Sequence, residues 1–190
     1  SSMRGELKIL KPIPLLIAIP TTAGTGSETT LAAVLTNEKT HEKYAVNDFV
    51  LIPRYAVLDP VLTRGLPKHI TAATGMDALT HAVEAYIGRS NTAETIEDSV
   101  SAVKLIFRNL EKAYRDGEDM EAREAVAYGS TMAGITMQLT STTAEHSMEH
   151  AMSAYHHNLP HGAGLIMISN EFYKFFVEKH ACDDQFIKMA

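Results

Sequence analysis

Five of the chain's nine histidines lie in one short stretch, EHSMEHAMSAYHHNLPHG, residues 145–162. His146 and His150 are four residues apart, so on a helix their rings would project from one face about a turn apart. His161 follows a proline and precedes a glycine, where a loop could bring its ring back over that helix. These imidazoles are candidate metal ligands.

A second pair with the same spacing lies in GMDALTHAVEAY, residues 75–86, where Asp77 precedes His81 by four residues. Such a pair can bind a divalent cation, but it also occurs on helix surfaces and at helix ends without any ligand role. Two helices and a loop that converge would combine one carboxylate with two or three imidazoles. That donor set suits iron(II) or zinc and is too rich in nitrogen for magnesium or calcium.

A competing motif overlaps the histidine-rich stretch, because His146-Ser-Met-Glu149-His150 matches the inverted zinc-protease pattern H-x-x-E-H. Under this hypothesis both histidines bind zinc and Glu149 is the general base. That class needs a further carboxylate ligand well downstream, and only a few acidic residues follow closely. The hypothesis also leaves Asp77 and His81 without a role.

The other candidate site is the hydroxyl-rich stretch IPTTAGTGSETT, residues 19–30, which follows an apolar run. Gly24 and Gly26 would let a ligand approach the backbone closely, and free N–H groups and hydroxyls could meet an anion. The stretch is not G-x-G-x-x-G and lacks the lysine of a phosphate-binding P-loop. A simple turn without a ligand is the alternative interpretation.

The predicted secondary structure that positions these residues changes from strands to helices near residue 62. Before it, short apolar runs predict strands at 15–20, 29–37, 42–48 and 55–60, the middle two forming a hairpin. After it, the pattern is helical, which predicts a β-rich segment over 1–62 and a mainly α-helical segment over 63–190. The fold class expected is therefore an α/β N-terminal remnant followed by a partial helical metal-binding domain.

The sequence also predicts where the helices begin, where they are interrupted and which face is buried. Pro67 suits the first turn of the first helix, and Gly75 is expected to interrupt it. A capping box formed by Thr142 and Glu145 is expected to open the helix that carries His146. Further helices are predicted over 119–139 and from residue 162. In the helix over 95–114, the face expected to be buried comprises Ile96, Val100, Val103, Phe107, Leu110 and Tyr114.

Composition narrows the classes of function. The net charge is −6, and lysine and arginine are scattered, so neither nucleic acid nor an anionic membrane is an expected partner. Cys182 is the single cysteine, which excludes an intrachain disulfide and a cysteine-based zinc site and favours a reducing cytoplasm. The apolar run PIPLLIAIP is too short and too proline-rich to cross a bilayer.

Taken together and in this order, PTTAGTGSE, LDP, ATGMDALTHAVEAY and EHSMEHAMSAYHHNLPHGAGL resemble the iron-containing (group III) alcohol dehydrogenases from about residue 12 onward. The resemblance implies part of the dehydroquinate synthase-like fold of that family. It also implies hydride transfer between an alcohol and NAD or NADP, with Fe²⁺ or Zn²⁺ lowering the pKa of the alcohol oxygen. The expected small-molecule partner is an alcohol or, in reverse, an aldehyde or ketone.

The resemblance also assigns roles to residues. It implies that the metal ligands are Asp77, His81, His146 and His161. His150 corresponds to a second family histidine near the nicotinamide and substrate, a reasonable proton relay. The loop before His161 varies in length within the family, so His156 and His157 are alternative positions. The residues expected to contact the dinucleotide are Thr21, Thr22, Gly24, Thr25, Ser27, Thr29, Lys43 and Leu62.

The chain also departs from the family pattern. Family members extend further at both ends and carry a GGGS-type pyrophosphate segment, which has no counterpart before Lys11. We therefore expect a middle piece that contains the metal ligands and part of the cofactor site, with exposed apolar faces that favour a homo-oligomer. A divalent-metal-binding module without redox activity remains the main alternative.

Overall fold

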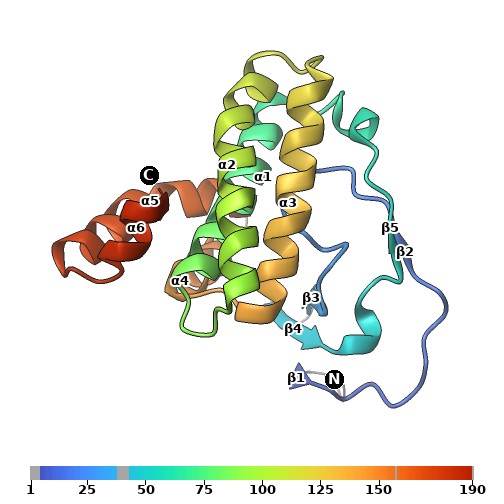
Figure 1. The fold of residues 1–190 in the computed structure, drawn as a ribbon. Coiled ribbons are helices and arrows are strands. Elements are labelled where there is room, and N and C mark those ends of the chain that lie inside the picture. Colours follow the sequence, from blue (N-terminus) through green and yellow to red (C-terminus); the bar gives the residue numbers. More distant parts are fainter. Residues whose placement is uncertain (1–4, 38–42, 157, 190) are drawn as a thin grey trace.

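The computed structural model describes residues 5–37, 43–156 and 158–189. Short strands occupy its N-terminal part, and helices fill most of the remainder (Figure 1). In the described ranges the helices are α1 (Lys68–Ile87), α2 (Ala93–Arg115), α3 (Met120–Thr140), α4 (Ala144–Tyr155), α5 (His161–Glu178) and α6 (Asp183–Met189). The predicted order of strands followed by helices is confirmed. None of these helices combines the length and apolar character needed to cross a membrane.

The described strands form two small sheets. They are β1 (Gly5–Glu6), β4 (Lys43–Asn47) and β3 (Ala32–Thr36), in that order, and separately β2 (Ile17–Ala18) beside β5 (Tyr55–Ala56). β3 and β4 are antiparallel with Val34 opposite Ala45, which confirms the predicted hairpin. The β1–β4 and β2–β5 pairs are parallel. Two single-turn 3₁₀ helices, η1 (Phe49–Leu51) and η2 (Pro60–Thr63), connect β4 and β5 to α1.

Helix α1 runs without a break through Gly75, so the prediction that this glycine interrupts the helix was wrong. Gly75 is buried against α2, and a Cβ atom at this position would lie 2.2 Å from Leu110 Cδ1. The glycine therefore allows two helices to approach closely, a role that depends on a partner and is invisible in the local sequence.

Helix α2 begins with a reciprocal capping box, in which each hydroxyl of Thr92 and Thr95 accepts the backbone N–H of the other residue. The predicted buried face is confirmed only in part, since Val103 is buried but Phe107 is 75% exposed, whereas Ile106 is fully buried. The buried residues of α2 are Thr95, Ser99, Ala102, Val103, Ile106 and Ala113. Apart from Val103 and Ile106, the buried side chains of this helix are small or polar.

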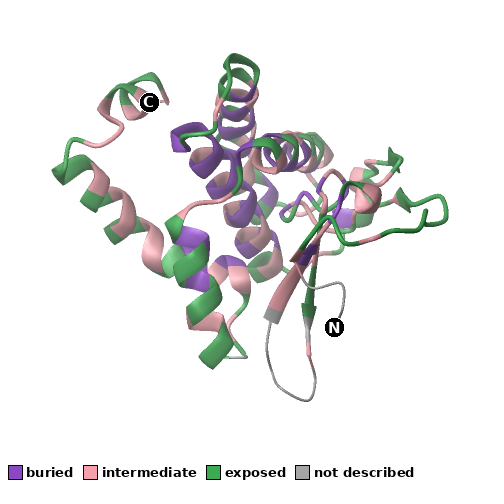
Figure 2. Ribbon diagram, turned by 90° about the horizontal axis from the view of Figure 1, so that it is seen from below, coloured by how far each residue is buried: buried purple, intermediate pink, exposed green. Residues whose placement is uncertain are grey.

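The core lies where α1, α2 and α3 pack side by side (Figure 2). Ala82 of α1, Ala102 and Val103 of α2 and Ala133 of α3 form its main apolar cluster. The burial is concentrated in this helical part, while the strands around β2 and β5 are largely exposed. Small residues at the contacts allow the three helices to form a rigid support.

Helices α4 and α5 pack against each other, and α5 also packs against α1. The N-cap of α4 is Thr143, whose side chain makes no capping hydrogen bond within the helix, so the predicted Thr142–Glu145 capping box was wrong. His161 is the first residue of α5, directly after the N-cap Pro160, rather than part of a loop. The ring of His161 is therefore fixed by a helix packed on two others.

Candidate metal centre

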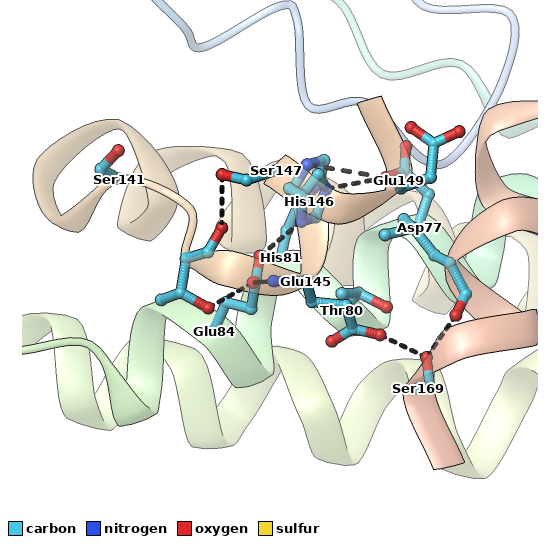
Figure 3. A network of polar contacts seen from close by, with 12 residues as sticks. Asp77, Thr80, His81, Glu84, Ser141, Glu145, His146, Ser147, Glu149 and Ser169 are labelled. Carbon is cyan, nitrogen blue, oxygen red and sulfur yellow. Dashed lines mark hydrogen bonds and ion pairs between the residues drawn. The ribbon is translucent and has the colours of Figure 1, made fainter. Parts of the chain in front are cut away.

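One carboxylate and three imidazoles gather where α1, α4 and α5 meet, and Figure 3 shows Asp77, His81 and His146 of this group. Asp77 Oδ1 lies 3.4 Å from His146 Nε2 and 3.5 Å from His161 Nε2. The potential ligand atoms of these three residues all lie within 4.8 Å of one another. His81 is outside this triad, but its Nε2 lies 3.6 Å from the same Asp77 oxygen.

The three separations that share Asp77 Oδ1 match edges of a tetrahedral metal site. Ligands 2.0–2.2 Å from a tetrahedral ion are about 3.3–3.6 Å apart, which is the range found around Asp77 Oδ1. The rings of His81 and His146 are stacked with their centroids 4.5 Å apart and lie in nearly parallel planes, so one of them would have to tilt for both to bind the same ion. The structure thus brings together all four residues expected to bind metal.

The hydrogen-bonding state of these atoms supports a bound cation. Among the described residues, Asp77 Oδ1 and His146 Nε2 are buried atoms that lack a hydrogen-bond partner. A buried polar atom without a partner is destabilising by roughly 1–3 kcal/mol. A divalent ion between these atoms would satisfy both, and the nitrogen-rich donor set fits Fe²⁺ or Zn²⁺.

Two fully buried glutamates contact the other nitrogens of the rings. Glu84 Oε2 pairs with His146 Nδ1, and Glu149 Oε2 pairs with His161 Nδ1. An ionised carboxylate only accepts hydrogen bonds, so these contacts place the ring proton on Nδ1. The Nε2 atoms of both rings are then free to face Asp77.

Charge at the site is balanced between Asp77 and the rings. Burial raises the pKa of Asp77, but the adjacent His81, His146 and His161 outweigh it and hold this pKa well below its ordinary value. Burial also lowers the pKa of His81. At His146, burial is outweighed by Asp77 and Glu84, which raise the pKa of its ring to about 9. A cation here would take the place of protons that the carboxylates attract.

His150 lies at the edge of the site. Its ring is exposed, with its centroid 5.3 Å from that of His161 and 6.3 Å from that of His146. Glu149, His150 and His161 form a second group whose potential ligand atoms lie within 4.8 Å of one another. In that group Glu149 is already paired with His161, so the buried triad is the better metal site. His156 is exposed at the end of α4, and His157 lies outside the described residues.

The hydroxyl-rich loop packs against α1, which carries Asp77 and His81, and against α3. Gly26 has a φ of 59°, and a Cβ atom there would lie 2.6 Å from Gly134 Cα in α3. The buried Glu28 accepts a hydrogen bond of 2.6 Å from the hydroxyl of Thr131 in α3. Gly24 packs on Thr74, one helical turn before Asp77. The loop therefore has a fixed position relative to α1 and α3.

The residues expected to contact the dinucleotide differ in exposure. The side chains of Thr21, Thr25 and Ser27 are exposed, which leaves them accessible to a ligand. Leu62 lies in η2 and is 44% exposed. Lys43 begins β4, but its side chain lies outside the described residues. Of the other residues expected to contact the dinucleotide, Gly24 is buried, and Thr22 and Thr29 are half-buried.

The sequence alone indicated no role for Glu84 or Glu28, and it indicated none for Glu149 in the proposed metal site. Spacing offered a signal for two of them, because Glu84 follows His81 by three residues and Glu149 follows His146 by three. On a helix that spacing places the carboxylate on the side of the histidine. Which ring each carboxylate contacts depends on how the helices pack, and Glu149 reaches His161 of another helix.

Two models of known protein families match the chain. A model of the Fe-containing alcohol dehydrogenase family, C-terminal, matches residues 71–187, and an iron-containing alcohol dehydrogenase model matches residues 2–60. The chain belongs to the iron-containing alcohol dehydrogenase family. Its mainly helical structure with a few short strands is part of the fold of this family.

Individual relatives give the same picture. The chain is 41% identical over 161 residues to a 1,3-propanediol dehydrogenase of Citrobacter freundii, covering 85% of this chain and 41% of that protein. It is 43% identical over 159 residues to an NAD-dependent methanol dehydrogenase of Bacillus methanolicus, covering 84% of this chain and 42% of that protein. The chain thus spans less than half the length of these relatives.

Solved structures of this family superimpose on the chain. A crystal structure of 1,3-propanediol oxidoreductase has a TM-score of 0.88 and 37% identity, and the match covers 91% of this chain and 45% of that one. A sulfoacetaldehyde reductase from Bifidobacterium kashiwanohense in complex with NAD+ has a TM-score of 0.81 and 34% identity, covering 88% of this chain and 45% of that one. The chain therefore shares its fold with a 1,3-propanediol oxidoreductase and with a sulfoacetaldehyde reductase.

Proposed function

We propose that this chain provides the metal centre and part of the dinucleotide site of an NAD(P)-dependent alcohol dehydrogenase. The reaction would interconvert a primary or secondary alcohol with the corresponding aldehyde or ketone. One observation carries the proposal: Asp77 Oδ1 lies 3.4–3.6 Å from three imidazole nitrogens in a buried site beside the fixed hydroxyl-rich loop. The alcohol and methanol dehydrogenases among its relatives support the assignment.

The proposed ligands of Fe²⁺ or Zn²⁺ are Asp77, His81, His146 and His161. When bound, such an ion supplies the Lewis acidity that makes an alcohol oxygen more acidic. Asp77 keeps its negative charge despite burial, because the surrounding imidazoles lower its pKa, and it thereby contributes the one anionic ligand. The helices α1, α4 and α5 hold these groups in place before any substrate arrives.

We assign proton transfer to His150. Its exposed imidazole lies beside the ring of His161, so its nitrogens can exchange a proton with both a bound substrate and water. The dinucleotide, NAD or NADP, is proposed to contact Thr21, Thr22, Gly24, Thr25, Ser27, Thr29, Lys43 and Leu62. One structural relative is known in complex with NAD+, and another relative is an NAD-dependent methanol dehydrogenase, which supports this choice. The single cysteine, Cys182, is consistent with the cytoplasm as the proposed location.

The geometry favours this proposal over a hydrolase that uses the H-x-x-E-H stretch. Such a hydrolase would need Glu149 as a general base that faces water, but its carboxylate is fully buried and paired with His161. It would also need His150 as a ligand beside His146, yet His150 is exposed. Asp77, which the hydrolase does not use, is instead central to the cluster.

Metal content per chain tests the proposal first. The wild-type chain, purified without chelator, is expected to contain about one iron or zinc ion, as one tetrahedral site predicts. Asp77→Ala should lose this ion, whereas Asp184→Ala, which removes an exposed carboxylate in α6, should keep it. Metal absent from the wild-type chain would contradict the proposed centre.

Cofactor and substrate measurements separate the remaining alternatives. The proposed dehydrogenase should change NADH fluorescence on binding and reduce NAD(P)⁺ in the presence of an alcohol. A chain that binds metal but shows neither response would be a non-redox metal module. Loss of metal in His150→Ala together with its retention in Asp77→Ala would instead support the hydrolase.

A further inference from the structure

We propose that Glu84 and Glu149 are positioning residues that fix the ring tautomers of His146 and His161 and thereby present both Nε2 atoms to the metal. This inference rests on the proposed metal centre and extends it to two residues that do not touch the ion. Both glutamates are fully buried, and each is paired with the nitrogen on the far side of a ligand ring.

Glu84 is held on both of its carboxylate oxygens. Oε2 accepts from His146 Nδ1, while Oε1 accepts from the hydroxyl of Thr143 and, at 3.2 Å, from the backbone N–H of Glu145. These contacts leave the carboxylate little freedom to rotate. The ring of His146 is therefore fixed by a group that is itself fixed (Figure 3).

The same contacts make Glu84 the N-terminal cap of α4. Thr143 is the N-cap residue but provides no side-chain capping bond, and Glu84 of α1 supplies the missing acceptor from another helix. A carboxylate near a helix N-terminus is also stabilised by the helix dipole. Asp77, a proposed metal ligand, lies two turns before Glu84 on the same helix, α1. Helix α1 therefore carries a proposed ligand and, through Glu84, also caps α4 and orients the ring of His146.

Glu149 performs the corresponding role between α4 and α5. Its Oε2 accepts from His161 Nδ1, in the first turn of α5. Gly164 allows this contact, because a Cβ atom there would lie 2.9 Å from both Cγ and Oε1 of Glu149. Each of the two histidines is thus oriented by a carboxylate from a different helix.

The consequence for metal binding follows from imidazole chemistry. A neutral ring that donates Nδ1–H to a carboxylate has its lone pair on Nε2, and the carboxylate makes that nitrogen more basic. Loss of such a partner lets the ring rotate or change tautomer. Partners of this kind change metal affinity by about 10–100-fold when they are mutated.

The test measures Zn²⁺ affinity of the full chain by competition with a chromophoric chelator. Glu149→Ala is expected to weaken binding by about 10–100-fold, and Glu149→Gln by less, because its amide oxygen can still accept from Nδ1–H. Glu84→Gln should also weaken binding, since its NH₂ group would face either Nδ1–H or the donors at the start of α4. The matched control is Glu145→Gln, also fully buried in α4 but hydrogen-bonded to Ser169 rather than to a ring.

A spectroscopic measurement distinguishes positioning from general loss of structure. In long-range ¹H–¹⁵N spectra of the Zn²⁺-loaded chain, His146 and His161 should carry their proton on Nδ1. Glu149→Ala should change the His161 signals while the His146 signals stay as in the wild type. The Glu149 variants leave the cap of α4 intact, so they decide the question even if Glu84→Gln does not fold.

Three different results would overturn the inference. Wild-type affinity and unchanged His161 signals in Glu149→Ala would show that the carboxylate does not position the ring, with the metal centre itself intact. Failure of the wild-type chain to bind Zn²⁺ would remove the proposed centre and this inference with it. If Glu145→Gln lost as much Zn²⁺ affinity as Glu149→Ala, the affinity would depend on any buried carboxylate and not on the contact with a histidine ring.

Discussion

At the scale of single residues, the metal centre depends on how closely the first turn of α5 approaches α1. Gly162 lies directly after His161, and a Cβ atom at this position would be 1.9 Å from the carbonyl oxygen of Ala73. Backbone atoms cannot yield as the end of a flexible side chain can. The glycine is therefore required for His161 to reach Asp77.

Gly162→Ala is expected to push α5 away from α1 and to move His161 from the centre. Overpacking of this kind is destabilising by about 1–3 kcal/mol, and the bound metal should be lost or weakened. Urea unfolding and metal content per chain measure the two effects. Gly65→Ala is the control, because a Cβ atom there meets nothing within 4 Å. Equal stability and metal content in both variants would contradict the close approach seen here.

The four-residue spacings of Asp77 and His81 and of His146 and His150 are local features, so the sequence offered candidate ligands, and the choice among them came from the resemblance to a family. The sequence could not show that His161 begins a helix, since that depends on contact between α5 and two other helices. The positions of Glu84 and Glu149 were missed for a related reason. A buried carboxylate has no local pattern that distinguishes it from an exposed one, and only the packed structure reveals its partner.

At the scale of elements, the orientation of α2 shows where hydrophobic periodicity is misleading. The largest apolar side chains indicated a face that includes Phe107, but Phe107 is exposed, and the buried residues of α2 are mostly small or polar apart from Val103 and Ile106. Close helix packing favours small side chains, and a pattern based on large apolar residues does not detect them. The extent of α2 was nevertheless predicted well, because its caps and its length are local properties.

Substitutions on adjacent positions of α2 test this orientation. Ile106→Ala should destabilise the chain by about 2–5 kcal/mol, because the side chain is fully buried. Phe107→Ala should change stability by no more than about 0.5 kcal/mol, as is usual for an exposed site. Urea denaturation of the two variants beside the wild type measures both values. The opposite order of the two effects would show that the originally predicted face is the buried one.

At the scale of the whole molecule, the helix α1 connects the two candidate sites. Gly24 of the hydroxyl-rich loop packs on Thr74, and Gly162 of α5 packs on the neighbouring Ala73. Both contacts lie within about one turn of Asp77. The distance between a dinucleotide on the loop and a metal on Asp77 is thus set by a single short segment of one helix.

Large apolar side chains remain exposed on the sheet formed by β2 and β5 and directly beside it. Leu15, Ile17, Tyr55 and Val57 are between 46% and 67% exposed. Exposed apolar side chains on two paired strands are typical of an interaction site, and short parallel strands with open edges can pair with further strands. We propose that a second copy of the chain covers this surface and produces the expected homo-oligomer.

Light scattering coupled to size-exclusion chromatography across a dilution series tests this expectation. The wild-type chain should have a mass above that of one copy, and Leu15→Lys should shift the equilibrium toward the monomer, because burial of an ammonium group at the contact is unfavourable. Phe107→Lys is the control, since it places the same charge on an exposed apolar residue of α2, away from β2 and β5. A wild-type chain that stays monomeric at every concentration would show that these apolar residues do not mediate self-association.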